Sequence, residues 1–264
     1  MICCSAQIAS VWGEPEKTLR KVEPLIMNAS CAGASLIAFP EQFATGWDPV
    51  SHANVEDCTG RTVSNLQNLA RKYSITIIGS FRERGNPLPR NVAVAVGKDG
   101  EVLAMYAKMH LFSPAHEDSA YTPGITLPVF SYEGVRWGMA ICYDLRFPAM
   151  FRIYARQGVH AVLVPAAWPA SRIRHWELFL SARAAENQMY IIGINTTGKN
   201  PVDQYSGATM TVDPYGTIVS RAGDREELLF SEIDPDLVDT VRAEFPIERD
   251  RKDALYHALL MGNS

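Results

Sequence analysis

The sequence predicts an α/β fold in which mixed sheets and helices form layers. Segments with the periodicity of strands and of helices alternate in the first half of the chain and again in its middle, and tight turns join further short apolar segments into antiparallel pairs. Because the chain contains no Gly-, Ser- or Pro-rich linker and no internal repeat, we expect one domain over residues 1–264.

In the first half, one apolar run stands out because it is continuous rather than alternating. Residues 36–39 (LIAF) are typical of a strand that is covered on both faces, and the run ends at Pro40 and Glu41. Helical spacing of apolar residues predicts the helices, and Gly97 and Gly100 mark the link of a hairpin. We expect strands at 2–9, 36–39, 75–80, 91–96 and 101–106, helices at 17–31 and 61–73, a charged loop at 81–90, and an irregular segment at 107–126.

The segment 135–148 (VRWGMAICYDLRFP) organises the middle of the chain. Large apolar residues alternate with small ones from Val135 to Ile141, as in a buried strand, and a helix is expected to begin near Phe147 and Pro148. Cys142 lies between them. A helix N-terminus favours negative charge, so this position suits a thiolate, whereas the alternative is a small cysteine that only fills the core.

The second half repeats the alternation of elements. The helix expected at 175–188 carries Trp176, Phe179, Leu180 and Ala184 on one stripe, and the turn 213–216 (DPYG) separates two strands. We expect helices at 147–157, 175–188 and 235–243, strands at 160–165, 190–195, 207–213, 217–221 and 227–233, and a polar tail.

Composition excludes several classes of function. The net charge is −4 and no run of Lys or Arg occurs, so nucleic-acid binding is not expected, and no apolar stretch approaches the length of a membrane span. The N-terminus lacks the pattern of a signal peptide. The five cysteines contain no CxxC, which fits free thiols in the reducing cytoplasm. The six histidines lack HxxxH spacing, so no metal is expected.

Three chemically active side chains follow strand ends. Glu41 ends the apolar run, Lys108 follows the hairpin and Cys142 ends the strand of the central segment. Ligand sites of α/β sheets lie beyond the ends of strands, so these three residues can meet although they are far apart in the sequence.

The motifs around these residues resemble those of a known family. The segments PEQF (40–43), YAKMHLF (106–112) and CYDLRFP (142–148) are similar, in order and separation, to the three signature motifs of the nitrilase superfamily of carbon–nitrogen hydrolases. The resemblance extends to 175–188 and 207–216. It implies a four-layer α-β-β-α sandwich with two mixed sheets flanked by helices.

By this resemblance, the catalytic triad falls on Glu41, Lys108 and Cys142, and a second glutamate of the family falls on Glu117. Cys142 would attack an amide carbonyl, Glu41 would move the proton, and Lys108 with the backbone N–H of Tyr143 would stabilise the oxyanion. No cofactor is implied. The family also implies a homodimer that pairs through helices near the cysteine segment.

Within the superfamily, CYDLRF resembles the amidase branch, and with AAWPASR (166–172) it looks most like bacterial ω-amidases, which act on 2-oxoglutaramate or 2-oxosuccinamate. Ala149 stands where many relatives have glutamate. Such a substrate carries a carboxylate, which an arginine could bind. The expected substrate-binding residues are Tyr143, Phe43, Arg146, Trp168 and Tyr121, with Arg172 as a further arginine.

Alternatives to this interpretation remain. Arg146 could instead be a structural ion-pair partner of Asp144 or a helix-end residue, and the aromatic residues could serve only packing. Another amidase of the superfamily, acting on deaminated glutathione or an N-carbamoyl amine, would use the same triad. A non-catalytic binding protein or a redox sensor built on Cys142 is the alternative from another class.

Overall fold

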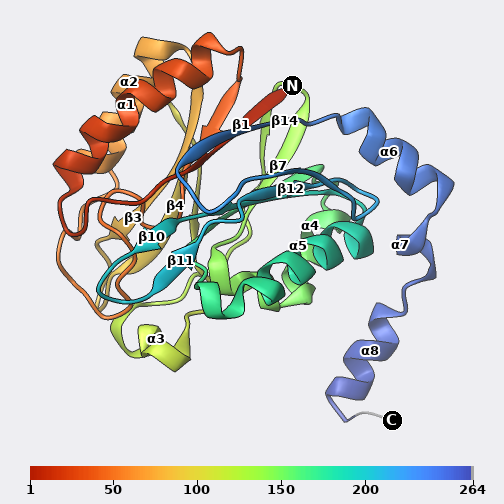
Figure 1. The fold of residues 1–264 in the computed structure, drawn as a ribbon. Helices are drawn as coiled ribbons and strands as arrows, with labels where there is room; N and C mark the ends of the chain where they lie inside the picture. Colours follow the sequence, from red (N-terminus) through yellow and green to blue (C-terminus); the bar gives the residue numbers. More distant parts are fainter. Residues whose placement is uncertain (263–264) are drawn as a thin grey trace.

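Two six-stranded sheets pack against each other in the computed structural model, which describes residues 1–262 (Figure 1). The first sheet contains, in spatial order, β14 (Glu227–Glu232), β1 (Ile2–Gln7), β2 (Leu36–Ala38), β3 (Thr76–Glu83), β4 (Arg90–Val96) and β5 (Val102–Ala107). The second contains β13 (Ile218–Arg221), β12 (Met210–Val212), β9 (Tyr190–Asn195), β8 (Ala161–Ala166), β7 (Val135–Met139) and β6 (Phe130–Tyr132).

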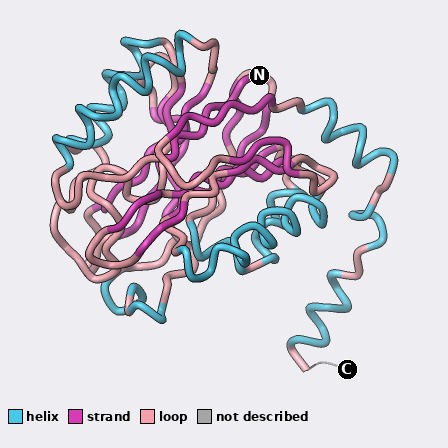
Figure 2. The backbone as a smooth tube through the Cα atoms, in the orientation of Figure 1, coloured by secondary structure: helices cyan, strands magenta, loops and turns pink. Residues whose placement is uncertain are grey.

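Helices cover the outer face of each sheet, as Figure 2 shows in cyan around the magenta strands. The larger helices are α1 (Pro15–Cys31) and α2 (Arg61–Tyr73) on the first sheet and α4 (Pro148–Arg156) and α5 (Ile173–Asn187) on the second. The predicted α-β-β-α sandwich with two mixed sheets is confirmed. The smaller elements are the hairpin β10 (Thr197–Lys199) and β11 (Gln204–Ser206) and the helices α3 (Glu117–Ala120), α6 (Pro235–Glu244), α7 (Ile247–Asp250) and α8 (Asp253–Leu260).

The central strands are apolar on both faces because each face meets a different core. In β4, Ala93 and Ala95 belong to the core between the sheets, whereas Val92, Val94 and Val96 belong to the core beneath α1 and α2. This is the period of two expected of a strand. Small residues face the opposite sheet and larger ones face the helices, so both layers are filled.

The helices bury the apolar faces that the residue spacing in the sequence indicates. In α5, Trp176, Leu180 and Ala184 are buried in the core that the second sheet forms with α4 and α5. Phe179 is half-buried and packs against this core. In α1, Val22 and Ile26 are among the residues buried against the first sheet. Burial of such side chains contributes about 1.5–3 kcal/mol each for a Val, Leu, Ile or Phe, so these stripes hold the layers together.

Strand directions bring distant segments to one edge of the sandwich. β1, β2 and β3 are parallel, as are β7, β8 and β9, so within each set the carboxyl ends lie together. β5 also ends at the edge where β2 ends, because the two antiparallel pairings β3–β4 and β4–β5 restore the direction. The loops after β2, β5, β7 and β8 are thereby placed to build a site.

Several sequence-based expectations are wrong in detail. β3 continues to Glu83 where a loop was expected, because Arg82 is buried and donates to Tyr121 Oη at 2.9 Å. The 107–126 segment contains α3, and β6, β10 and β11 are short strands that the apolar pattern does not reveal. The strand expected at 207–213 contracts to β12, because Gly207 and Ala208 have positive φ.

The C-terminal tail is helical rather than merely polar. α6, α7 and α8, in blue, extend from the sandwich, and α8 lies at its periphery (Figure 1). α8 buries none of its residues; Leu255, Leu259 and Leu260 are exposed, and Asp253 is tied to Arg152 of α4 at 3.0 Å. Over the part of the chain that the structure describes, no helix has the length and apolarity needed to cross a membrane.

Candidate active site

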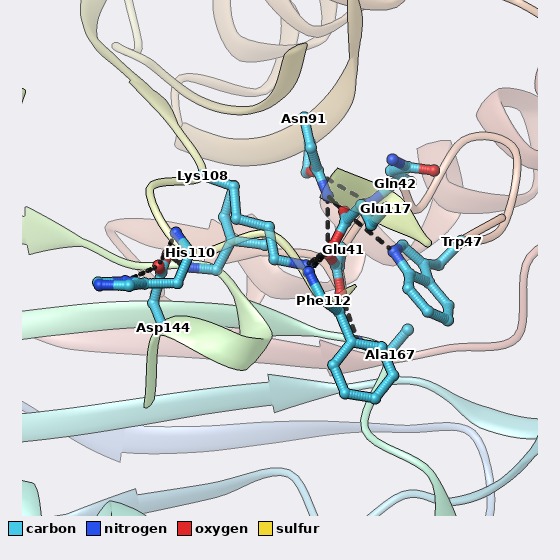
Figure 3. A network of polar contacts seen from close by, with 12 residues as sticks. Glu41, Gln42, Trp47, Asn91, Lys108, His110, Phe112, Glu117, Asp144 and Ala167 are labelled. Atoms are coloured by element: carbon cyan, nitrogen blue, oxygen red, sulfur yellow. Dashed lines mark hydrogen bonds and ion pairs between the residues drawn. The ribbon is translucent and has the colours of Figure 1, made fainter. Parts of the chain in front are cut away.

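The three predicted catalytic side chains come from loops at the shared edge of the two sheets. Glu41 follows β2, Lys108 directly follows β5, and Cys142 begins the 3-10 turn Cys142–Arg146 after β7. Figure 3 shows the lysine reaching the carboxylates from the first sheet. Lys108 and Cys142 line the same cavity. The structure therefore brings together residues from both sheets.

Lys108 lies between two carboxylates in a site closed to water. Its Nζ is 2.8 Å from Glu41 Oε1 and 2.8 Å from Glu117 Oε2, and the three side chains have no exposed surface. Burial by itself would lower the pKa of Lys108, but the charges of Glu117 and Glu41 outweigh it and raise the pKa above its ordinary value. The lysine is therefore a fixed cation at neutral pH.

Asn91, at the start of β4, belongs to the same network although the sequence analysis did not select it. Its Nδ2 donates to Glu41 Oε1 at 2.7 Å and to Glu117 Oε1 at 3.0 Å. The only sequence signal is a polar residue at the head of an otherwise apolar strand, which is common at strand ends. Asn91 lies 50 residues after Glu41 in the sequence, so local sequence patterns do not connect the two residues.

The two glutamates differ in their remaining hydrogen bonds. Glu117 Oε2 also accepts from the backbone N–H of Phe112 at 2.7 Å, and its Oε1 also accepts from Trp47 Nε1 at 3.5 Å, so each of its oxygens has two donors. Oε2 of Glu41 accepts only from the backbone N–H of Ala167, at 3.1 Å, among the described residues. Glu117 is thus held as a saturated carboxylate, whereas Glu41 keeps one oxygen with lone pairs to spare.

The pKa values of the two acids follow this difference. Burial raises the pKa of Glu41, and Lys108 opposes this only in part, since the charge of Glu117 adds to the rise. Burial also acts to raise the pKa of Glu117, but Lys108 and the donors from Phe112 and Asn91 lower it below the ordinary value. Of the pair, Glu41 is the acid with the greater affinity for a proton.

The turn that carries Cys142 is held by Asp144. Cys142 has φ of 45°, in the left-handed region that non-glycine residues seldom adopt. Asp144 is fully buried, and its Oδ2 accepts from the backbone N–H of Ile141 at 2.9 Å and from Tyr106 Oη at 2.7 Å. Its Oδ1 accepts from the backbone N–H of His110 at 2.9 Å. Asp144 therefore ties the cysteine turn to the lysine segment.

The surroundings of Cys142 do not favour the expected resting thiolate. Burial and the charge of Glu41 raise the thiol pKa well above its ordinary value, and Lys108 offsets only part of this. α4 begins at Pro148, beyond the 3-10 turn, so the helix N-terminus does not lie at the sulfur. The raised pKa disfavours a resting thiolate, so attack by the sulfur calls for a base.

A cavity of about 240 Å³ gives access to the cysteine. Its lining combines two of the predicted catalytic side chains with aromatic rings and two guanidinium groups. The lining includes Lys108, Cys142, Trp47, Phe112, Tyr143, Trp168, Arg146, Arg172 and Asp203. The predicted binding residues Tyr143, Arg146 and Trp168 lie in this lining. Asn195 fixes the Trp168 loop, because its Oδ1 accepts from the Trp168 N–H at 2.7 Å.

Two predicted binding residues do not line this cavity. Phe43 is fully buried and stacks on Phe39 with 4.9 Å between ring centroids, in the core beneath α1 and α2. The chain turns at Gln42, whose φ is 48°, and this turn directs Phe43 away from the site. Tyr121 is also buried, and its Oη donates to the carbonyl of Ser51 at 2.8 Å. Both aromatics serve packing and loop anchoring.

Arg146 and Arg172 have no carboxylate partner within ion-pairing distance among residues 1–262. The guanidinium of Arg146 lies over the Trp168 ring at 4.9 Å, and that of Arg172 over the Phe112 ring at 5.4 Å. The alternative of an Arg146–Asp144 ion pair is wrong, since His110 Nδ1 lies against Asp144 at 2.8 Å. Desolvation lowers the pKa of Arg146, and Arg172 nearby adds to this.

Metal binding has no obvious support in the described part of the chain, where no three His, Cys, Asp or Glu side chains gather in a group able to hold an ion.

Comparison with known proteins places this arrangement in a family. Residues 4–243 match the family model of carbon–nitrogen hydrolases. The chain belongs to the carbon–nitrogen hydrolases of the nitrilase superfamily. It is 32% identical to a 2-oxoglutaramate amidase of Bacillus subtilis over 93% of this chain and 95% of the relative. It is 33% identical to a deaminated glutathione amidase of a Synechocystis strain over 87% of this chain and 90% of the relative.

The fold agrees with solved structures as well. A carbon–nitrogen hydrolase superfamily protein from Xanthomonas campestris superposes with a TM-score of 0.89 at 25% identity, covering 96% of this chain and 97% of that one. With the amidases among its relatives, this carbon–nitrogen hydrolase is an amide-hydrolysing enzyme.

Proposed function

We propose that this carbon–nitrogen hydrolase, acting as a single domain over its whole chain, cleaves small terminal amides through a thioester on Cys142, without a cofactor. The observation that carries the proposal is the fully buried Lys108, 2.8 Å from both Glu41 and Glu117, on the wall of the cavity that Cys142 also lines. A buried cation beside a thiol and a proton-accepting carboxylate is the set of groups that amide cleavage needs.

The first half of the reaction forms the thioester. Glu41 Oε2 takes the proton of Cys142 as the sulfur attacks the amide carbonyl carbon, and the C=O electron pair moves to oxygen. Lys108 and the N–H of Tyr143 stabilise this oxyanion. When the C–N bond breaks, Glu41 returns its proton to the nitrogen and ammonia leaves. Glu117 acts by holding Lys108 in place.

The second half releases the acid. Glu41 takes a proton from water, whose oxygen attacks the thioester carbonyl, and Lys108 again faces the oxyanion. The C–S bond then breaks, the proton on Glu41 passes to the sulfur, and the acid departs. The enzyme returns to its protonated resting thiol, which is the state that the raised pKa of Cys142 favours.

We propose that the substrate is 2-oxoglutaramate or 2-oxosuccinamate, as in an ω-amidase. Two features of the cavity support a short amide with a distal carboxylate. Its volume of about 240 Å³ suits a small molecule better than a tripeptide derivative. Arg146 and Arg172 provide two guanidinium groups against the single carboxylate of Asp203 in the lining. The relative named as a 2-oxoglutaramate amidase is consistent with this choice.

Ammonia release from 2-oxoglutaramate, deaminated glutathione and N-carbamoyl-β-alanine tests the proposal. We expect the highest kcat/KM for 2-oxoglutaramate, because its far carboxylate can reach the arginines. Cys142→Ala is the control: it should fold as the wild type does and release no ammonia. A higher kcat/KM for either of the other two amides would contradict the ω-amidase assignment, and turnover by Cys142→Ala would contradict the thioester.

We also propose a homodimer that forms through helices near the cysteine segment and resides in the cytoplasm. α4 follows the cysteine turn directly, and its Ile153 is 46% exposed, while Leu178 of α5 is 62% exposed. Exposed apolar residues on neighbouring helices are typical of an interface. The five cysteines are all free, as expected in a reducing compartment.

A binding or redox role is less well supported. Glu41, Lys108 and Cys142 are all present; Lys108 and Cys142 line one cavity and Glu41 contacts Lys108 at 2.8 Å, an arrangement that a non-catalytic protein does not need. For redox sensing, Cys142 has no resolving cysteine in the cavity lining, and its raised thiol pKa disfavours the reactive thiolate.

A further inference from the structure

The side chain of Asn91 closes a ring of hydrogen bonds around the catalytic carboxylates. Its Nδ2 lies 2.7 Å from Glu41 Oε1 and 3.0 Å from Glu117 Oε1, while Lys108 Nζ lies 2.8 Å from Glu41 Oε1 and 2.8 Å from Glu117 Oε2. An amide nitrogen has two hydrogens, one for each acid. Asn91 is 1% exposed, so water does not compete for these bonds.

The orientation of this amide follows from its surroundings. If the amide were turned over, its oxygen would face two carboxylate oxygens and lose both hydrogen bonds, so the nitrogen must point at the acids. The Oδ1 atom of Asn91 then has no hydrogen-bond partner among the described residues. This unpaired oxygen costs free energy, and the two hydrogen bonds from the amide nitrogen to Glu41 and Glu117 offset that cost.

The ring leaves only one oxygen of Glu41 free to act. Oε1 already accepts from Asn91 and Lys108, whereas Oε2 accepts only from the N–H of Ala167, at 3.1 Å. Ala167 lines the same cavity as Cys142, so the N–H that binds Oε2 belongs to the residue that borders the thiol's cavity. Without Asn91, Glu41 could rotate and share its oxygens differently between Lys108 and the thiol.

We propose that Asn91 is a positioning residue, which acts through Glu41 by fixing Oε2 as the base and by stabilising the ionised carboxylate. This deepens the proposed function and rests on it. The main chain of Asn91 has a separate role: its carbonyl accepts from the Lys108 N–H at 2.8 Å. A side-chain substitution can therefore remove the amide donor while it leaves that backbone link in place.

The charged and titratable groups around Glu41 set the direction of the expected effect. Lys108 faces it from the end of β5, Glu117 from α3, Cys142 from the cysteine turn, and Tyr205 from β11. Lys108 and the hydrogen bond from Asn91 lower the pKa of Glu41, while burial and Glu117 raise it. Loss of the amide donor must therefore raise that pKa and weaken the base at low pH.

The test is the pH profile of kcat/KM for Asn91→Leu, which has a similar size but no donor. Activity falls as pH drops through the pKa of Glu41, and we expect this acid limb to move to higher pH by about one unit, the size of one hydrogen bond to a charged group. Asn91→Asp should move the limb in the same direction, because a third carboxylate also opposes ionisation of Glu41. It provides a second test should Asn91→Leu not fold.

Asn187→Leu is the matched control. Asn187 is also a buried asparagine, and its Nδ2 donates to the carbonyl of Arg183 at 3.0 Å at the end of α5, away from the catalytic carboxylates. This variant should lose thermal stability without a shift of the acid limb. An unshifted limb in both Asn91 variants would overturn the proposal and would show that Asn91 has only a structural role.

A second readout separates this inference from the proposed function. The rate at which iodoacetamide alkylates Cys142 needs no substrate, and its rise with pH reports how readily the thiol proton leaves. If no amide is hydrolysed, the proposed function fails, but the Asn91 variants should still alkylate with a pH profile displaced from that of the wild type. If amides are hydrolysed and both profiles coincide with those of the wild type, only the Asn91 inference fails.

Discussion

At the scale of residues, the two buried glutamates differ in pKa because their hydrogen-bond partners differ. Glu117 accepts from four donors, two at each oxygen, whereas Glu41 accepts from three, of which only the Ala167 N–H reaches Oε2. Saturation lowers the pKa of Glu117, and burial raises that of Glu41. The assignment of the base therefore follows from counting donors around each carboxylate.

Arg172→Gln should weaken binding of a carboxylate substrate. Loss of one charge-assisted contact costs about 1.5–3 kcal/mol, so we expect KM for 2-oxoglutaramate to rise roughly 10- to 100-fold with a smaller change in kcat. The measurement is steady-state ammonia release from 2-oxoglutaramate and from propionamide, which has no carboxylate.

Arg174→Gln is the control for this substitution, because Arg174 is exposed at the start of α5 and does not line the cavity. It should leave KM unchanged. An equal rise in KM for propionamide in Arg172→Gln would show that the arginine shapes the cavity and does not bind the carboxylate.

At the scale of elements, the cysteine turn is a strained segment that its neighbours hold in place. The positive φ of Cys142 costs free energy, and Asp144 stabilises the turn through bonds to Ile141, Tyr106 and His110. The ring of His110 stacks on Phe147 with 3.8 Å between centroids. The segment that follows Lys108 and the segment that follows Cys142 are thereby joined as one unit.

Asp144→Asn should loosen this unit. The new NH₂ group would face donors that the buried carboxylate now satisfies, so we expect the free energy of unfolding to fall by about 2–4 kcal/mol and kcat/KM to fall at least tenfold. Urea denaturation and steady-state kinetics measure the two effects.

Asp213→Asn is the matched control, because Asp213 also accepts from backbone N–H groups, those of Tyr215 and Thr217 at 2.9 Å, but in an exposed turn. Its unfolding free energy should change by less than about 1 kcal/mol. Equal losses in the two variants would argue against a special role for Asp144.

At the scale of the whole molecule, the sandwich places helices α4 and α5 on an outer face that is left partly apolar. Ile153 and Leu178 are exposed there, and α8 begins beside α4 through the ion pair of Asp253 with Arg152. The proposed dimer would bury this face. Interfaces of stable dimers bury about 800 Å² per partner or more, which requires the faces of several helices.

The double substitution Ile153→Asp and Leu178→Asp should therefore dissociate the dimer. Charges placed at an apolar interface are desolvated without partners, so we expect the dissociation constant to rise at least 100-fold. Sedimentation velocity over a range of concentrations measures it. Ile125→Asp, at a residue 90% exposed in the loop before β6, is the control and should remain dimeric. A wild type that sediments as a monomer would contradict the dimer itself.

The sequence alone predicted the layered α/β fold, the helix at 61–73 with its observed bounds, and the position of Glu41, Lys108 and Cys142 just after strands. These predictions succeed because periodicity and strand termini are local properties. Apolar alternation specifies which face of a segment is buried, whatever lies on the other side of it.

Only the tertiary structure decided which polar atoms meet. It showed that Asn91 joins the two glutamates, that Phe43 turns into the core, and that burial raises the pKa of the Cys142 thiol. These properties depend on contacts between segments far apart in the chain and on the exclusion of water around them. Desolvation and hydrogen-bond saturation arise only when the two sheets close over the site, and no local pattern encodes them.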